Sequence, residues 1–151
     1  MGIEENKAIL KEVWEQIINR DNYDKLYDLF HKDYVYHAPG GHEVRGPDDL
    51  KKVFIKIREN IPDFRANIED LIAEGNKVVS QCTILGTLNK VGKQGKFDDI
   101  VISRIVDGKI VEEWEVCDRL SIVQQGAKGW FQKKMIAGIV RQLDKAAGFV
   151  E

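Results

Sequence analysis

The hydrophobic pattern of this chain changes its period at Pro62, and that change limits the folds open to it. Before Pro62, apolar residues recur every three or four positions, as on one side of an amphipathic helix. After Pro62, four β-rich runs follow one another with short turns between them: 64–73, 78–88, 97–106 and 110–118. Consecutive strands joined by short turns form an antiparallel meander. Helices first and a sheet second predict an α+β fold rather than a doubly wound parallel sheet.

The N-terminal part predicts helices over 4–19 and 23–30, followed by a brief strand over 34–37. A third helix is expected over 46–60, because Pro47 and two aspartates suit its first turn. The tail turns helical again over 129–149, with apolar residues spaced by three or four. Together with the meander, these elements describe one domain over 1–151.

Length and composition exclude several classes of protein. The chain has 151 residues, of which 43% are hydrophobic and 32% charged, with a net charge of −2. This balance suits a globular core and does not suit a nucleic-acid surface. No apolar run reaches the roughly 18 residues of a membrane span. The charged N-terminus is unlike a signal peptide, and Cys82 and Cys117 form no recognisable spacing. We therefore expect a cytoplasmic protein with no nucleic-acid and no membrane partner.

Several short segments follow one another in an order typical of one family. They are Tyr36-His37-Ala38-Pro39, Val44-Arg45-Gly46, Ile61-Pro62-Asp63-Phe64, the run DLIAEGNKVV at 70–79, Gly86-Thr87, the run RIVDGKIVEEW at 104–114, and Asp118. This set resembles the SnoaL-like polyketide cyclases of the nuclear transport factor 2-like superfamily, over about residues 4–126. The resemblance implies a cone-shaped, curved, mixed but mainly antiparallel sheet. That sheet would pack on the N-terminal helices around an internal pocket, with 129–149 as an extra C-terminal helix.

Asp118 is the first candidate catalytic residue. Strand alternation places Glu112, Trp114, Val116 and Asp118 on one face, which we expect to line the pocket. Burial there would raise the pKa of the Asp118 carboxyl and make it a base for a carbon acid. The resemblance implies the same role, because the acid–base aspartate of the family occupies the matching position. The alternative is that Asp118 caps a short helix beginning at Arg119.

His37 is the second catalytic candidate, since it ends a short strand and would hydrogen-bond a substrate carbonyl or share a proton with Asp118. Its alternative is a loop histidine with one face in solvent. The candidate substrate-binding residues are Trp14, Tyr34, Tyr36, Leu88, Arg104 and Trp114. Aromatic residues at such positions also occur in ordinary cores. A one-residue shift of the hairpin register would put Arg104 on the outer surface.

We expect no metal site and no cofactor. The three histidines have no i, i+4 pair, and no glycine-rich loop would cradle a phosphate. Asp98 and Asp99 are adjacent, so their side chains point to opposite faces of a strand. We interpret them as a solvated strand end.

The resemblance implies a cofactor-independent enzyme of the polyketide-cyclase or isomerase type, acting by acid–base chemistry on a small, mostly apolar carbonyl compound. The alternative is a non-catalytic small-molecule-binding or accessory domain of the same fold. Leu88 favours it, because the common family pattern has histidine at that position. A third possibility is an interaction module. Both faces of the strand runs carry apolar residues, so we also expect a homodimer formed through the outer face of the sheet.

Overall fold

The computed structural model describes residues 2–88, 92–118, 121, 125 and 129–146. The chain begins with helical elements and continues into strands, in the order predicted from the sequence. The elements are α1 (Ile3–Glu12), the π-helix η1 (Val13–Asn19), α2 (Lys25–Leu29), β1 (Phe30–Ala38), β2 (His42–Arg45), α3 (Gly46–Asn60), β3 (Arg65–Glu74), β4 (Lys77–Leu88), β5 (Lys93–Val106), β6 (Lys109–Cys117) and α5 (Gly129–Ala146).

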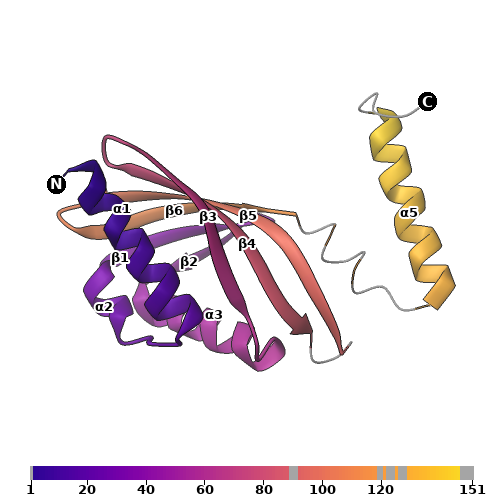
Figure 1. Ribbon diagram of the computed structural model, residues 1–151, viewed down its shortest axis with the longest axis horizontal. Coiled ribbons are helices and arrows are strands. Elements are labelled where there is room, and N and C mark those ends of the chain that lie inside the picture. Colours follow the sequence, from indigo (N-terminus) through magenta and orange to yellow (C-terminus); the bar gives the residue numbers. More distant parts are fainter. Residues whose placement is uncertain (1, 89–91, 119–120, 122–124, 126–128, 147–151) are drawn as a thin grey trace.

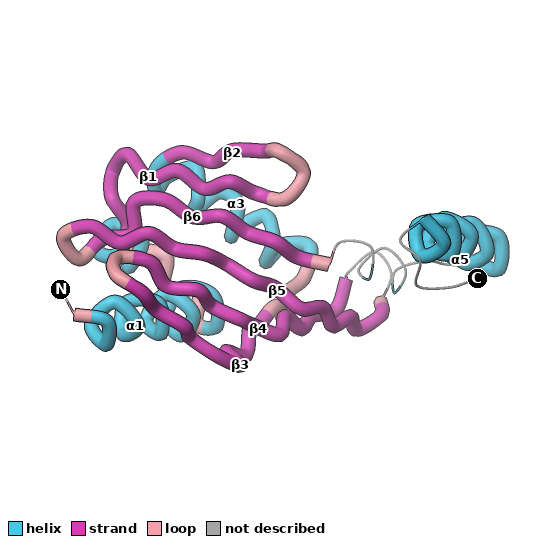
Figure 2. Tube along the Cα trace, turned by 90° about the horizontal axis from the view of Figure 1, so that it is seen from above, coloured by secondary structure: helices cyan, strands magenta, loops and turns pink. Residues whose placement is uncertain are grey.

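The strands form one six-stranded sheet in the order β2-β1-β6-β5-β4-β3, which Figure 2 shows from above. The meander from β3 to β6 is antiparallel throughout. β1 then adds to the far side of β6 in parallel, with Tyr36 beside Glu113 and His37 beside Trp114. The sheet is therefore mixed but mainly antiparallel, and the predicted α+β class is confirmed.

The helices α1, η1, α2 and α3 cover one face of the curved sheet, as Figure 1 shows. The other face carries no helix among the described residues. α5 stands apart from the sheet in both views. No described helix, α5 included, is long and apolar enough to cross a membrane.

Two polar side chains attach the helical layer to the start of β3. The Asn19 side chain donates to the Ala66 carbonyl (2.9 Å) and accepts from the Ala66 amide (2.8 Å). The Arg58 guanidinium donates to the carbonyl oxygens of Ile18 (2.9 Å) and Phe64 (2.7 Å). These bonds satisfy backbone groups at the corner where helices give way to the sheet. They also fix one end of the space between the two layers.

Three details differ from the sequence prediction. The first helix continues as a π-helix from Val13, and β2 follows a turn at Gly40-Gly41 that the sequence reading treated as part of a loop. β5 begins at Lys93, within the residues expected to form a turn. Glycines and lysines have low strand propensity, yet β4 supplies a partner for each residue from Lys93 to Arg104, and this pairing overrides local preference.

We predict that Gly86→Ala destabilises the domain. A Cβ atom on Gly86 would lie 2.2 Å from Cγ2 of Ile61, a branched side chain with little freedom to move. Overpacking of this kind costs about 1–3 kcal/mol of unfolding free energy. Urea denaturation would measure the loss. Gly138→Ala is the matched control, because nothing lies within 4 Å of its Cβ position, and an unchanged midpoint for Gly86→Ala would contradict the packing.

Candidate active site

A cavity of about 450 Å³ lies between the concave face of the sheet and the helices. Its helical wall is apolar and is built from α1, η1 and α3, with Leu10, Val13, Trp14, Ile18, Leu50, Val53, Phe54 and Ile57. The sheet supplies the opposite wall, where apolar side chains alternate along the chain with outward-facing residues. The volume is within the range of small-molecule sites.

Asp99 on β5 is a buried acid in the sheet wall, and its hydrogen bonds are incomplete. It is 5% exposed, and its Oδ1 has no hydrogen-bond partner among the described residues. Burial raises the pKa of Asp99 to about 7, helped by the nearby Glu113 carboxyl and opposed by a backbone hydrogen bond from Ile100. A carboxyl with this pKa exchanges protons at neutral pH, as a general base must.

Glu113 on β6 forms a closed hydrogen-bonded group with two hydroxyls. Tyr34 donates to its Oε2 and Ser103 donates to its Oε1, both at 2.5 Å. All three residues are buried, and burial raises the pKa of Glu113 and of Tyr34. With both oxygens already bonded, Glu113 is held in one position and completes the polar strip beside Asp99.

Glu115 and Cys117 follow on the same face of β6. The Tyr36 hydroxyl donates to Glu115, in parallel with the Tyr34–Glu113 pair. Ligand atoms of Asp99, Glu115 and Cys117 all lie within 4.8 Å of one another, so these residues could offer donors to a metal ion. Exposed acidic groups often gather without an ion, whereas Asp99 in this group is buried. The expectation that the protein works without a metal therefore stays a prediction.

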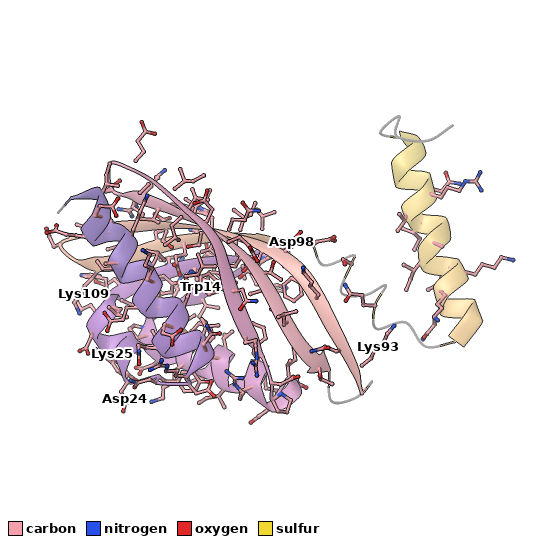
Figure 3. The ribbon with its side chains drawn as sticks, in the orientation of Figure 1. Trp14, Asp24, Lys25, Lys93, Asp98 and Lys109 are labelled. Atoms are coloured by element: carbon pink, nitrogen blue, oxygen red, sulfur yellow. The ribbon has the colours of Figure 1, made fainter. Side chains whose placement is uncertain are left out.

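Trp14 stands on the opposite, helical wall of the cavity, and Figure 3 shows it between the first helices and the sheet. The residue is 7% exposed, and its Nε1 has no hydrogen-bond partner among the described residues. An indole N–H can only donate. Within the described part of the chain, the two walls thus hold one buried donor and one buried acceptor without partners, and unsatisfied groups of this kind often mark a ligand site.

Trp14, Tyr34 and Tyr36 line the cavity, where the sequence analysis expected them. The structure corrects the expected position of the other aromatic and charged candidates. His37, Arg104 and Trp114 lie on the outer face, because the pairing of β1 with β6 turns Tyr36 and Glu113 inward and the intervening residues outward.

The outer residues form their own set of contacts. His37 Nε2 is 2.9 Å from an oxygen of Glu112, and the His37 ring stacks on Trp114 with a centroid separation of 5.4 Å. Arg104 donates to Glu112 from Nε (3.1 Å) and Nη2 (2.8 Å). These hydrogen bonds lower the pKa of Glu112. The expected hydrogen bond of His37 to a substrate in the cavity is therefore not supported by its position.

Asp118 directly follows β6 and is exposed. Its Oδ1 accepts a hydrogen bond from the backbone amide of Ser121 (2.9 Å), which is the geometry of the helix-cap alternative. It does not belong to the described lining of the cavity. The expected face was wrong by one residue: Glu113, Glu115 and Cys117 point inward. Leu88 ends β4, and its side chain lies outside the described residues.

The sequence analysis missed Asp99 by interpreting it as part of a solvated strand end. Asp98 is exposed as expected, but Asp99 is buried. A signal was present in the alternation of Phe97, Asp99, Val101, Ser103 and Ile105, since every other member of a strand shares one face. An aspartate in phase with the apolar Phe97, Val101 and Ile105 indicates a buried acid.

Comparison with known proteins adds a family match. A model described as SnoaL-like polyketide cyclase matches residues 8–126. No curated protein matches the chain.

Solved structures are similar over most of the chain. A protein from Jannaschia sp. CCS1, described provisionally as a SnoaL-like polyketide cyclase, superposes with a TM-score of 0.79 at 16% identity, covering 85% of this chain and 97% of that one. A protein from Bacillus cereus ATCC 10987, described provisionally as a polyketide cyclase, gives 0.71 at 27% identity, with 81% and 80% covered. An LEH-like epoxide hydrolase from M. tuberculosis gives 0.66 at 16% identity, with 77% and 84% covered.

Proposed function

We propose that this chain, which belongs to the SnoaL-like polyketide cyclase family, is a cofactor-independent enzyme of the cyclase or isomerase type. Its substrate would be a small, mostly apolar carbonyl compound, and its chemistry would be proton transfer. The observation that carries this proposal is the buried Asp99 in the wall of an otherwise largely apolar cavity.

The reaction begins with abstraction of a proton from the carbon next to the carbonyl group. The C–H bond breaks, its proton passes to the Asp99 carboxylate, and the electron pair moves to the carbonyl oxygen, giving an enolate. Return of the proton to another carbon gives isomerisation, whereas attack of the enolate on a second carbonyl group closes a ring. A carboxyl with a pKa of about 7 suits both acceptance and return of the proton.

Trp14 is our candidate for stabilising the enolate oxygen. Its Nε1–H is a buried donor on the wall opposite Asp99, and it has no partner among the described residues. The hydroxyls of Tyr34 and Tyr36, the other donors in this wall, already donate to Glu113 and Glu115. A donor without a competing partner is the better electrostatic stabiliser, because it needs no reorganisation when charge develops.

Asp118, and not Asp99, is the residue that the family resemblance implies as acid–base group. Its exposed position and its bond to the Ser121 amide support the cap instead. The catalytic role of Asp118 stays a prediction, and its test accompanies that of Asp99 in the Discussion.

Hydrogen–deuterium exchange of 1-tetralone tests the proposal without knowledge of the natural substrate. This bicyclic ketone carries hydrogens next to its carbonyl group, and NMR follows their replacement by deuterium in D₂O. We expect the protein to accelerate exchange above the buffer rate in the presence of EDTA. Acceleration that is lost in EDTA would contradict cofactor independence. Binding of the ketone without acceleration would instead identify the non-catalytic binding domain, which the mostly apolar lining also supports.

We further propose that the chain forms a homodimer in the cytoplasm through the open face of its sheet. Ile72, Ile100 and Val116 on that face are 61%, 42% and 68% exposed. The register aligns Ile72, Val79, Ile102 and Trp114 in one row across four strands. An apolar surface of this extent typically marks an interface.

We expect light scattering to give twice the chain mass of 17.3 kDa at micromolar concentration. Val116→Lys places a charge beside Ile100 on this face and should shift the mass to that of one chain. The control is Ile55→Lys, because Ile55 is 42% exposed on α3, away from the sheet surface. A wild-type mass of one chain would refute the dimer.

A further inference from the structure

His37 lies on the outer face of the sheet, where its ring contacts the strands on both sides of β1. Its Nδ1 is 3.4 Å from an oxygen of Glu43 on β2, and its Nε2 is 2.9 Å from an oxygen of Glu112 on β6. The ring also stacks on Trp114 of β6. One side chain of β1 therefore links the three strands β2, β1 and β6 at this edge of the sheet.

A neutral imidazole cannot satisfy both of these carboxylates. It has one N–H and one lone pair, whereas an ionised carboxylate only accepts hydrogen bonds. If Nε2–H donates to Glu112, the closer acceptor, the lone pair of Nδ1 faces Glu43, which is unfavourable. The protonated ring carries an N–H on each nitrogen, so both contacts become favourable and charge-assisted. The charge of His37 thus decides whether it holds β2.

The other charged groups near the ring contact its partners rather than the ring itself. On β2, Arg45 pairs with Glu43 at 2.6 Å, and on β5, Arg104 donates to Glu112 at 2.8 Å. Lys77 of β4 lies 5.5 Å from the centroid of the indole on which the histidine stacks. Each glutamate keeps its arginine whatever the charge of the ring. A change between pH 5 and pH 8, where histidine side chains titrate, therefore acts on these contacts through the histidine.

The contact with Glu43 joins the two strands of a hairpin that borders the cavity. In the register, Glu43 lies directly opposite His37. β2 is an edge strand that pairs with β1, and the turn between them has positive φ at Gly40-Gly41. Four residues of this hairpin line the cavity: Ala38, Pro39, His42 and Val44. Release of the edge strand would therefore open the cavity.

We propose that the charge on His37 controls how firmly the hairpin of β1 and β2 closes the cavity. The protonated ring holds Glu43 and keeps the hairpin closed at low pH. The neutral ring releases Glu43 at higher pH, so the hairpin opens more often and ligands enter and leave faster. The inference rests on the proposed function only in taking this cavity as the ligand site, and it adds a regulation of that site.

Amide hydrogen exchange followed by mass spectrometry tests the inference on the ligand-free protein. Protection factors, corrected for the intrinsic exchange rate, are compared at pH 5.5 and pH 8.5 for residues 36–45. Residues 70–80, from the hairpin of β3 and β4, are the internal reference, because a pH effect on the whole domain changes both segments. Relative to this reference, protection of 36–45 should be about three- to fivefold lower at pH 8.5, the scale of a partly exposed ion pair.

Two variants with opposite expected results make the test specific. His37→Gln cannot gain a proton, so its hairpin should show the lower protection at both pH values. Glu43→Gln provides an N–H that the neutral ring accepts through Nδ1, so this hairpin should keep the higher protection at pH 8.5. His31→Gln is the matched control, since His31 lies on the same strand but its ring contacts Asp33. Its pH dependence should equal that of the wild type.

Equal relative protection of the wild-type hairpin at both pH values would overturn the inference. So would a Glu43→Gln protein that loses protection at pH 8.5 as the wild type does, and this comparison decides alone if His37→Gln does not fold. The measurements need no ligand, so they are independent of the ketone assay. A pH-dependent hairpin without ketone exchange would refute the proposed enzyme and leave this inference standing, whereas ketone exchange with a pH-independent hairpin would do the reverse.

Discussion

Asp99→Asn should slow the exchange of 1-tetralone by about 10²-fold or more, the scale on which positioned acid–base groups act. The change is nearly isosteric and removes only the ability to accept a proton as a carboxylate. Asp99 lines the cavity and is buried, and its pKa of about 7 leaves a large fraction ionised at neutral pH. Ketone affinity should therefore be retained while the rate falls.

Two further aspartate variants make this result specific. Asp98→Asn is the control, because Asp98 is the chain neighbour of Asp99 in β5 and its side chain is exposed (Figure 3). Its exchange rate should equal that of the wild type. Asp118→Asn decides between the two candidate bases. A large loss in Asp118→Asn with full activity in Asp99→Asn would place the chemistry where the family resemblance implies.

Asp99 should also make the protein less stable at pH 8 than at pH 5. The pKa of Asp99 is raised from 3.8 to about 7, so the folded state binds this proton more tightly than the unfolded chain. Stability from such a group is fully present below the unfolded pKa and is lost as the pH rises through 7. Each unit of difference corresponds to about 1.4 kcal/mol, which gives a loss of roughly 2–3 kcal/mol between pH 5 and pH 8. The raised pKa of Glu113 acts in the same direction.

Urea denaturation of the wild type and Asp99→Asn at both pH values measures this effect. The variant should lose the part of the pH dependence that Asp99 contributes and should be the more stable protein at pH 8, because it no longer buries an ionised carboxylate at position 99. The lowered pKa values of Asp63 and Glu112 act only at more acidic pH, since their stabilisation is lost as the pH falls below about 4. Equal pH dependence in the two proteins would show that Asp99 has an ordinary pKa.

The order of helices and strands was predictable because hydrophobic period and turn chemistry are local properties. The helix 46–60 and the turn at Asp107-Gly108 appear as expected. The position of β1 was not predictable from pattern alone, since its parallel pairing with β6 joins residues about 77 positions apart. β2 also escaped detection, because four residues after two glycines carry too weak a strand signal.

The candidate site was predicted only in part because of the two-residue period of a strand. The sequence analysis proposed Tyr36 and His37 together, although neighbours in a strand face opposite ways, and only Tyr36 lines the cavity. For β6, the sequence analysis expected Trp114 and Asp118 to face the pocket, which would place Glu113 and Glu115 on the outer face. A register error of one residue exchanges the two faces completely. The hydrogen bonds of Tyr34 and Tyr36 to Glu113 and Glu115 show which residues of β6 face the cavity. Those contacts exist only in three dimensions.

A crystal structure of the protein soaked with 1-tetralone tests most directly whether this cavity is the substrate site. We predict ligand density between the sheet and the helices, with the carbon next to the carbonyl about 3–3.5 Å from an Asp99 oxygen, as a reactive complex requires. The carbonyl oxygen should face Trp14 Nε1. Density for the ketone beside Asp118, with the cavity unoccupied, would contradict the account.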